Sequence, residues 1–306
     1  MNKLIWITII ILIFSLPAYA LRDPQIPDGS MFTYSEFIKV TDDSLLKALD
    51  QEPEGRVTKK HLDQEMIYTY KVNSYTQDNA KYYKINIAST SVPGLNEIGH
   101  SKFELIVKDD LSPVHLYYHD ISQATGLEIQ GDMRWDYSKK ILHYYAKTVY
   151  GKNQDIKYDV NLKYGQLYGE AISEFPLGLL YAAGFPDNNE KALKTLAPYT
   201  QVFGMPVVDF NIAVAKESEE LVTPAGKFRC HKVTAIPNPP EVYKPFLFLL
   251  GVLGRFGDMF SQTYWVTDTA PYITVKYHIT IMSVFQRDGV LQKADYGSKA
   301  DTITLK

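Results

Sequence analysis

Cysteine is almost absent from this chain of 306 residues, in which Cys230 is the only example. A single cysteine cannot form a disulfide within the chain, so a stable fold must depend on a hydrophobic core. A catalytic thiol is disfavoured, because the adjacent His231 would point to the opposite face of a strand. We therefore expect Cys230 to be a buried structural residue.

The sequence also lacks an excess of charge of either sign, with 32 basic residues against 35 acidic ones and a net charge of -3. Proteins that bind nucleic acid usually carry a basic excess that neutralises phosphates, so no nucleic-acid partner is expected. The nucleophile elbow of hydrolases, the phosphate-binding loop, the dinucleotide fingerprint and the zinc-protease helix motif are all missing. The sequence therefore indicates no catalytic residue, no metal ligand and no cofactor.

Two groups of polar residues have the spacing of functional clusters, but each has a simpler explanation. His115 and His119 are spaced like metal ligands on a helix, yet they lie in a predicted strand, where four residues span about 13 Å. Asp132 and Asp136, on either side of Arg134, could line a sugar site or form a solvent-facing polar row. We favour the solvent-facing row.

A hydrophobic run at the N-terminus has the three parts of a secretory signal peptide. Lys3 supplies positive charge, residues 4–16 are apolar, and Ala18 and Ala20 are the small residues that signal peptidase reads. As a helix the run would rise only about 20 Å, short of the roughly 30 Å hydrocarbon core, so a retained membrane anchor is the weaker alternative. We predict a signal peptide over residues 1–20 and a periplasmic location.

Tyrosine is abundant, at 23 residues, and aromatic residues make up 13% of the chain. Tyr- and Ile-rich runs separated by polar turns are typical of antiparallel strands. Such runs predict strands at residues 66–72, 81–89, 102–108, 114–120, 127–137, 141–150, 156–164, 207–217, 221–236, 263–268 and 272–285. The polar residues 287–306 are predicted to form an edge strand or a tail.

Helical patterns are confined to short segments. Residues 35–50 alternate at a loosely helical period, which predicts one helix within an N-terminal arm over residues 21–64. Capping residues predict two further short helices, one between Ser173 and Gly184 and one that begins near Asp187. The predicted fold class is mainly β: a single open antiparallel β-barrel, or a strongly curved sheet, over residues 65–306 with a few short helices.

A tight hairpin is predicted at Thr223, Pro224, Gly226 and Phe228. Proline presets φ for the turn and glycine tolerates positive φ, so this motif joins two antiparallel strands.

Residues 245–256 form an apolar segment whose only charge is Arg255. As a helix it would be apolar on every side, so something must cover it. It belongs either in the protein's own core or in a lid that contacts lipid or an apolar ligand. One stripe of this segment, together with a tryptophan of a later strand, gives the predicted ligand-binding residues: Phe246, Leu249, Leu250, Leu253 and Trp265.

Several short motifs together resemble a known bacterial family. They are the signal peptide, the Tyr-rich strands, residues 177–181, the hairpin motif, and Trp265 ahead of Pro271 and Val275. On these motifs the sequence resembles the Gram-negative periplasmic proteins known as domain of unknown function 3108, over roughly residues 66–280. The resemblance implies a half-barrel similar to the carriers of outer-membrane lipoproteins, with an apolar concave face. It implies no catalytic residues, because the family has no assigned reaction.

The leading functional hypothesis is an exported, periplasmic, non-enzymatic protein that binds an apolar small molecule, a lipid or a lipoprotein acyl chain in the concavity of the barrel. Two alternatives stay open. The protein could be an envelope assembly or interaction factor that docks on a membrane surface or an envelope protein through residues 245–256. It could also be a secreted hydrolase that uses carboxylates brought together by folding.

We predict that the exported protein begins at Leu21, because Ala18 and Ala20 satisfy the small-residue rule for cleavage and Pro17 ends the apolar helix. N-terminal sequencing of protein taken from the cell envelope tests this. An intact Met1 in a membrane fraction would show instead that residues 4–16 stay in place as an anchor.

Overall fold

The computed structural model describes residues 26–40, 64–91, 99–109, 113–122, 128–150, 152–161, 190–195, 208–238, 244–249, 257, 261–281 and 285–297. The predicted signal peptide and the predicted helix between Ser173 and Gly184 lie outside these ranges. Within the ranges, no helix has the length and apolar character needed to span a membrane.

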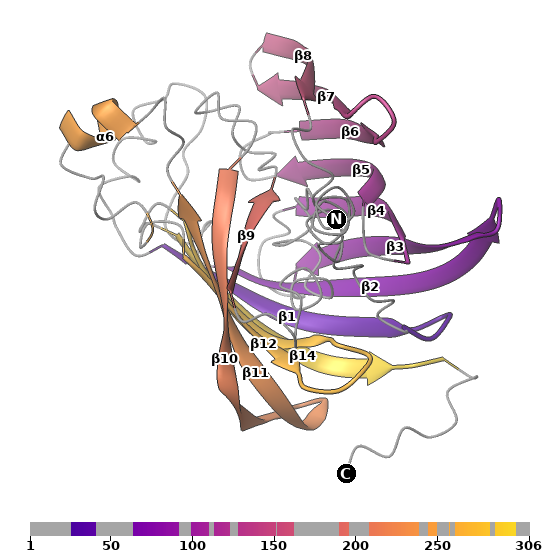
Figure 1. Ribbon diagram of the computed structural model, residues 1–306, viewed down its shortest axis with the longest axis vertical. Helices are drawn as coiled ribbons and strands as arrows, with labels where there is room; N and C mark the ends of the chain where they lie inside the picture. The colour runs from indigo at the N-terminus through magenta and orange to yellow at the C-terminus, as the bar shows by residue number, and fades with distance from the viewer. Residues whose placement is uncertain are drawn as a thin grey trace, which may run out of the picture.

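A single antiparallel sheet of 14 strands makes up almost all of the described chain (Figure 1). Its strands are β1 (Met31–Val40), β2 (Gln64–Gln77), β3 (Ala80–Ser91), β4 (Gly99–Lys108), β5 (Pro113–Ser122), β6 (Glu128–Asp136), β7 (Ile141–Tyr150), β8 (Lys152–Asn161), β9 (Glu190–Thr195), β10 (Val208–Thr223), β11 (Gly226–Asn238), β12 (Gln262–Thr267), β13 (Thr274–Ile281) and β14 (Phe285–Asp295). The described chain also holds one short helix, α6 (Lys244–Leu249).

The sheet is open, because the described strands at its two ends, β8 and β9, do not pair with each other. The spatial order runs from β8 down to β1 and then from β14 down to β9. We call these two halves the arms of the sheet. Within each arm, every strand pairs with its neighbour in sequence. Figure 1 shows a strongly curved sheet, in which β10 and β11 run steeply relative to β1 and β2. The predicted fold class, mainly β with an open, curved antiparallel sheet, is confirmed.

Alternating burial explains why these segments form strands. In β2, Met66, Tyr68, Tyr70 and Val72 are buried, whereas the residues between them are partly or fully exposed. Successive side chains of a strand point to opposite faces, so this pattern gives one face that packs and one that meets water. The registers place the buried residues of neighbouring strands opposite each other, as for Tyr70 and Ile87 of β3. We call the packed side the buried face and the other side the outer face.

Three predictions of local structure were wrong. Residues 35–40, expected in a helix, belong to β1, which pairs with β2 and β14 inside the sheet. The helix expected from Asp187 is replaced over Glu190–Thr195 by β9, which pairs with β10. The polar C-terminal residues up to Asp295 form β14 between β1 and β13, so this strand is central, not an edge. Pairing with other strands of the sheet outweighs the weak local preference in each case.

The hairpin motif lies at the turn between β10 and β11. Thr223 pairs with Gly226, and Gly226 has a φ of 136°. Phe228, two residues after Gly226, is the first buried side chain of β11. A positive φ is costly for residues that carry a Cβ, which explains the glycine.

We predict that Gly226→Val lowers the free energy of unfolding by about 1 kcal/mol or more, because valine must adopt the positive φ of the turn. Chemical denaturation measures the change. Lys227→Val is the matched control, since the structure gives Lys227 no positive φ and its ion pair with Glu220 is exposed. Equal midpoints for the two variants would contradict the prediction.

Candidate functional site

The buried face is an apolar and aromatic surface that continues across both arms of the sheet. Its side chains are less than a tenth exposed and include Tyr34, Tyr83, Leu105, Met133 and Leu142 on one side of the β1–β14 junction. On the other side it continues through Val233, Tyr264, Val275 and Leu291. A surface of this composition suits hydrocarbon and aromatic groups.

Near the middle of this apolar face lies a buried ion pair between β1 and β14. The Glu36 side chain is 0% exposed and that of Arg287 is 13% exposed. Arg287 donates from Nε to Glu36 Oε1 at 3.1 Å and from Nη2 to Oε2 at 2.9 Å. Two parallel bonds of this kind are the strongest arrangement for an arginine and a carboxylate.

Tyr277 of β13 completes the polar group. Its hydroxyl donates to Glu36 Oε2 at 2.5 Å. The Tyr277 ring reaches Glu36 across Gly289, where a Cβ would come within 2.0 Å of Tyr277 Cζ, so only glycine fits under the ring. Burial, reinforced by the charge of Glu36, raises the pKa of Tyr277 well above its usual value, so the phenol stays protonated and remains a donor.

Aromatic rings surround this polar group. Tyr34 packs edge-on against Tyr70 at 5.2 Å and lies 6.3 Å from the Tyr277 ring, which in turn lies 6.2 Å from that of Tyr264. The Tyr34 hydroxyl donates to the carbonyl oxygen of Thr274 at 2.7 Å, and burial raises its pKa. The rings therefore enclose the charges and join β1, β2, β12 and β13 into one packed unit.

Cys230 is buried, as expected, on the packed side of β11. Burial raises the pKa of its thiol to about 12, and the charges of Asp268 and Glu219 act in the same direction. The thiolate is the nucleophilic form, so this thiol is unreactive near neutral pH.

The structure does not bring the five predicted ligand-binding residues together. Trp265 lies on the outer face, where its ring is 5.0 Å from Lys276 Nζ and 5.8 Å from Lys232 Nζ, and its Nε1 donates to Glu219. Phe246 and Leu249 belong to α6, whereas Leu250 and Leu253 lie outside the described residues. The neighbouring Phe248 is 71% exposed. The role of the apolar segment as a ligand contact therefore stays a prediction.

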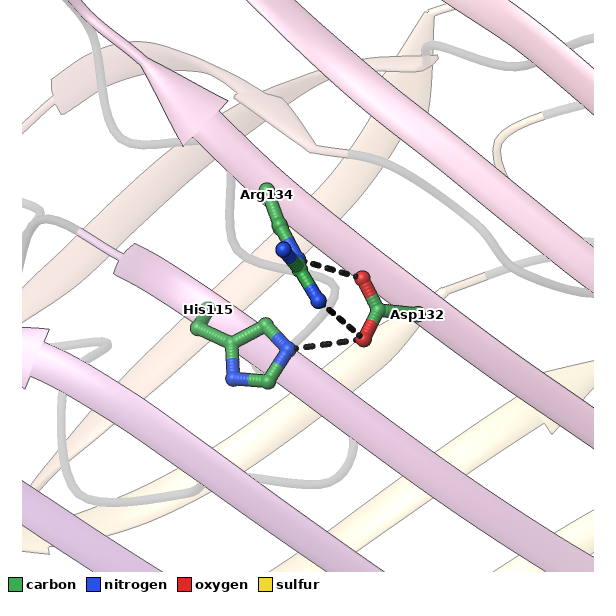
Figure 2. Close-up of polar contacts among 3 residues, drawn as sticks. All are labelled: His115, Asp132 and Arg134. Carbon is green, nitrogen blue, oxygen red and sulfur yellow. Dashed lines mark hydrogen bonds and ion pairs between the residues drawn. The ribbon is translucent and has the colours of Figure 1, made fainter.

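A second polar cluster lies on the outer face of β5 and β6 (Figure 2). Arg134 donates from Nε to Asp132 Oδ1 at 2.9 Å and from Nη2 to Oδ2 at 3.4 Å. His115 Nε2 lies 2.9 Å from the same Oδ2. Partial burial acts to raise the pKa of Asp132, but the hydrogen bonds and charges of His115 and Arg134 outweigh it, so the pKa is lowered.

Further histidines on this face each contact their own carboxylate. His119 Nε2 lies 3.0 Å from Glu128 Oε1, and His143 Nδ1 lies 2.8 Å from Asp159 Oδ1. His115 and His119 thus have different partners. Among the described residues, no group of three or more potential metal ligands is found.

The polar row predicted around Arg134 does face solvent. Asp132, Arg134 and Asp136 lie on the outer face, whereas Met133 and Trp135, which alternate with them, are buried on the other side of the sheet. Sequence reasoning missed both polar groups described above, the one at Glu36 and the pairing of Asp132 with His115. The only signal for Glu36 in the sequence was a charge at a position where the alternation of β1 requires a buried residue, and the wrong helix prediction concealed it.

Comparison with known proteins gives no family assignment. No known family profile matches the chain and no curated protein is similar to it, so the resemblance to domain of unknown function 3108 stays a prediction. Among solved structures, the chain is similar to a beta-barrel-like protein of the domain of unknown function DUF1849 from Brucella abortus, with 10% identity, a TM-score of 0.49, and 88% of this chain and 98% of that chain covered.

Two other solved structures show weaker likeness. One is a candidate lipoprotein from Parabacteroides distasonis, with 12% identity, a TM-score of 0.32, and 88% of this chain and 96% of that chain covered. The other is a candidate exported protein with a YmcC-like fold from Bacteroides fragilis, with 11% identity, a TM-score of 0.33 and the same coverage.

We predict that Glu36→Leu lowers the free energy of unfolding by about 3–5 kcal/mol, because it removes the carboxylate that neutralises the largely buried charge of Arg287. Denaturation with urea measures the loss. Glu104→Leu is the control, since Glu104 pairs with Lys84 at 2.8 Å in a partly exposed position, where an ion pair contributes about 0–1 kcal/mol. The double variant Glu36→Leu with Arg287→Met should recover most of the stability, and equal losses for Glu36→Leu and Glu104→Leu would contradict the prediction.

Proposed function

We propose that this protein is an exported, non-enzymatic protein of the bacterial envelope that binds an apolar ligand, such as the acyl chain of a lipid or lipoprotein, against the buried face of its curved sheet. The observation that carries the proposal is the continuous apolar and aromatic face of a sheet that does not close. The side chains of this face are less than a tenth exposed in the protein without ligand, so an apolar ligand reaches them only when the part of the chain that covers them moves aside.

The energetics of this binding require no reacting group. An acyl chain gains about 25 cal/mol for each Å² of apolar surface removed from water, or about 0.8 kcal/mol for each methylene group. A chain of a dozen methylenes therefore supplies on the order of 10 kcal/mol before the costs of association, which is enough for specific binding.

The apolar segment 245–256 is the proposed lid over the ligand. Its Phe248 side chain is 71% exposed, so it is available to contact an apolar ligand. We propose that Phe246, Leu249, Leu250 and Leu253 close on the ligand from the same segment. Trp265 lies on the outer face and takes no part in this proposal.

Two matched variants test the lid. Phe248 and Val222 are both 71% exposed, so a serine at either position should leave the fold intact. We expect Phe248→Ser to weaken binding of a fluorescent fatty acid several-fold, because it removes an apolar contact of the lid. Val222→Ser, in the hairpin of β10, should bind as the unmodified protein does.

The ligand itself is identified by mass spectrometry of an organic extract of protein purified from its native envelope. Lipid present at a stoichiometric amount, together with displacement of the fatty acid probe, supports the proposal. No lipid in the extract and no binding of the probe would contradict it. A protein partner retained at one copy per chain, with no lipid, would favour an assembly factor that docks through residues 245–256.

A further inference from the structure

Arg134 lies at the centre of a row of basic side chains on the outer face. The register of β5, β6 and β7 places His115 opposite Arg134 and Arg134 opposite His143. Neighbouring strands lie about 4.8 Å apart, so the three side chains share one stretch of surface about 10 Å wide. Arg134 is 69% exposed, and both histidines are at least partly exposed, so a ligand in solvent can reach the row.

Asp132 holds the guanidinium of Arg134 in a fixed orientation. It accepts from Nε and from Nη2, and within the described residues it is the only partner of that guanidinium. An arginine carries five N–H donors in a planar fork, so the two bonds to Asp132 leave Nη1 and one hydrogen of Nη2 directed away from the carboxylate. This edge has the geometry that binds two oxygens of a phosphate.

The two histidines each keep one ring nitrogen free of their carboxylate. His115 uses Nε2 for Asp132, and His143 uses Nδ1 for Asp159, so Nδ1 and Nε2 respectively remain. A neutral imidazole that donates to a carboxylate has an acceptor at its other nitrogen, which becomes a donor only after protonation. Each of these nitrogens therefore donates to a phosphate oxygen only when the ring is protonated.

Charged groups from β6 and β8 surround the two histidines. His115 faces the apolar Ile106 from β4 and the charged Asp132 and Arg134 from β6, and His143 faces Arg134 from β6 and Asp159 from β8. Lys157 of β8 adds a further positive charge close by, over the Tyr145 ring at 5.2 Å. Arg134 and Lys157 balance Asp132 and Asp159, so each protonated histidine gives the site a positive charge.

We propose that Arg134, with His115 and His143 on either side and Asp132 as its positioning residue, binds a phosphate group on the outer face of the sheet. The phosphate is either a free phosphate ester or the headgroup of a lipid, since both present the same oxygens. This site is on the opposite side of the sheet from the apolar face of the proposed function, so failure of either proposal leaves the other unaffected.

Inorganic phosphate added to the protein at constant pH is the direct test. NMR signals of the His115 and His143 rings should shift toward the protonated position with a saturable, 1:1 dependence on phosphate. Arg134→Gln should weaken this binding at least tenfold, because a charge-assisted bidentate contact is lost. Lys139→Gln, which removes an exposed charge in the adjacent turn, should bind as the unmodified protein does.

Asp132→Ala distinguishes binding by an oriented guanidinium from nonspecific attraction of phosphate to positive charge. Loss of a negative charge alone would strengthen anion binding, whereas loss of the orienting carboxylate should weaken it, and we expect the weaker binding. Shifts that do not saturate, equal effects of Arg134→Gln and Lys139→Gln, or tighter binding by Asp132→Ala would overturn the proposal. Circular dichroism checks that each variant keeps its strands.

Vesicles distinguish the two sources of phosphate. Binding to phosphatidylcholine vesicles that contain phosphatidic acid, absent with phosphatidylcholine alone and lost in Arg134→Gln, identifies a lipid headgroup. Binding of inorganic phosphate without vesicle binding identifies a free phosphate ester. Failure of both would overturn the site while leaving the fatty acid test of the buried face unaffected.

Discussion

The pairing of β1 with β14 is the constraint on which the rest of the structure depends. Each arm of the sheet is a meander in which every described strand pairs with its neighbour in sequence, but β1 and β14 join residues near opposite ends of the chain. This is the junction through which the two arms become one sheet. The buried ion pair lies at the same junction and joins residues 251 positions apart.

The buried polar group at this junction fixes the register of β1 against β14. An unpaired charge in an apolar interior costs several kcal/mol, so the register that brings Arg287 to Glu36 is favoured over registers that separate them. Tyr277 adds a second requirement, because its ring crosses the strand only where Gly289 leaves room. Apolar residues alone would tolerate a slip of two positions along the strand, whereas this polar group does not.

Much of the fold could be predicted from the sequence, because alternation and Tyr-rich composition are local signals. The strands β2 to β8 and β10 to β13 lie close to the predicted ranges for this reason. The position of β1 could not be predicted in the same way. Ser35, Glu36 and Lys39 interrupt its apolar pattern and imitate a loosely helical period, and the partner that explains Glu36 lies at the other end of the chain.

The two polar groups were harder to predict than the strands. Contacts across strands depend on register, and a shift by one residue moves every side chain to the other face. His115 and Asp132 are 17 positions apart and meet only because β5 and β6 align as they do. The sequence alone showed that Arg134 and Asp132 share a face, but it did not show which strand lay beside them.

The place of β1 in the sheet also bears on how the protein is made. A chain that emerges from a ribosome or a translocation channel does so from its N-terminus, so β1 is exposed long before β14 is available. The first arm can assemble from local hairpins during this time, but β1 then presents an unpaired edge to its surroundings. Chains of this topology therefore pass through a stage in which an edge strand needs protection from other chains, and β14 ends that stage when it arrives.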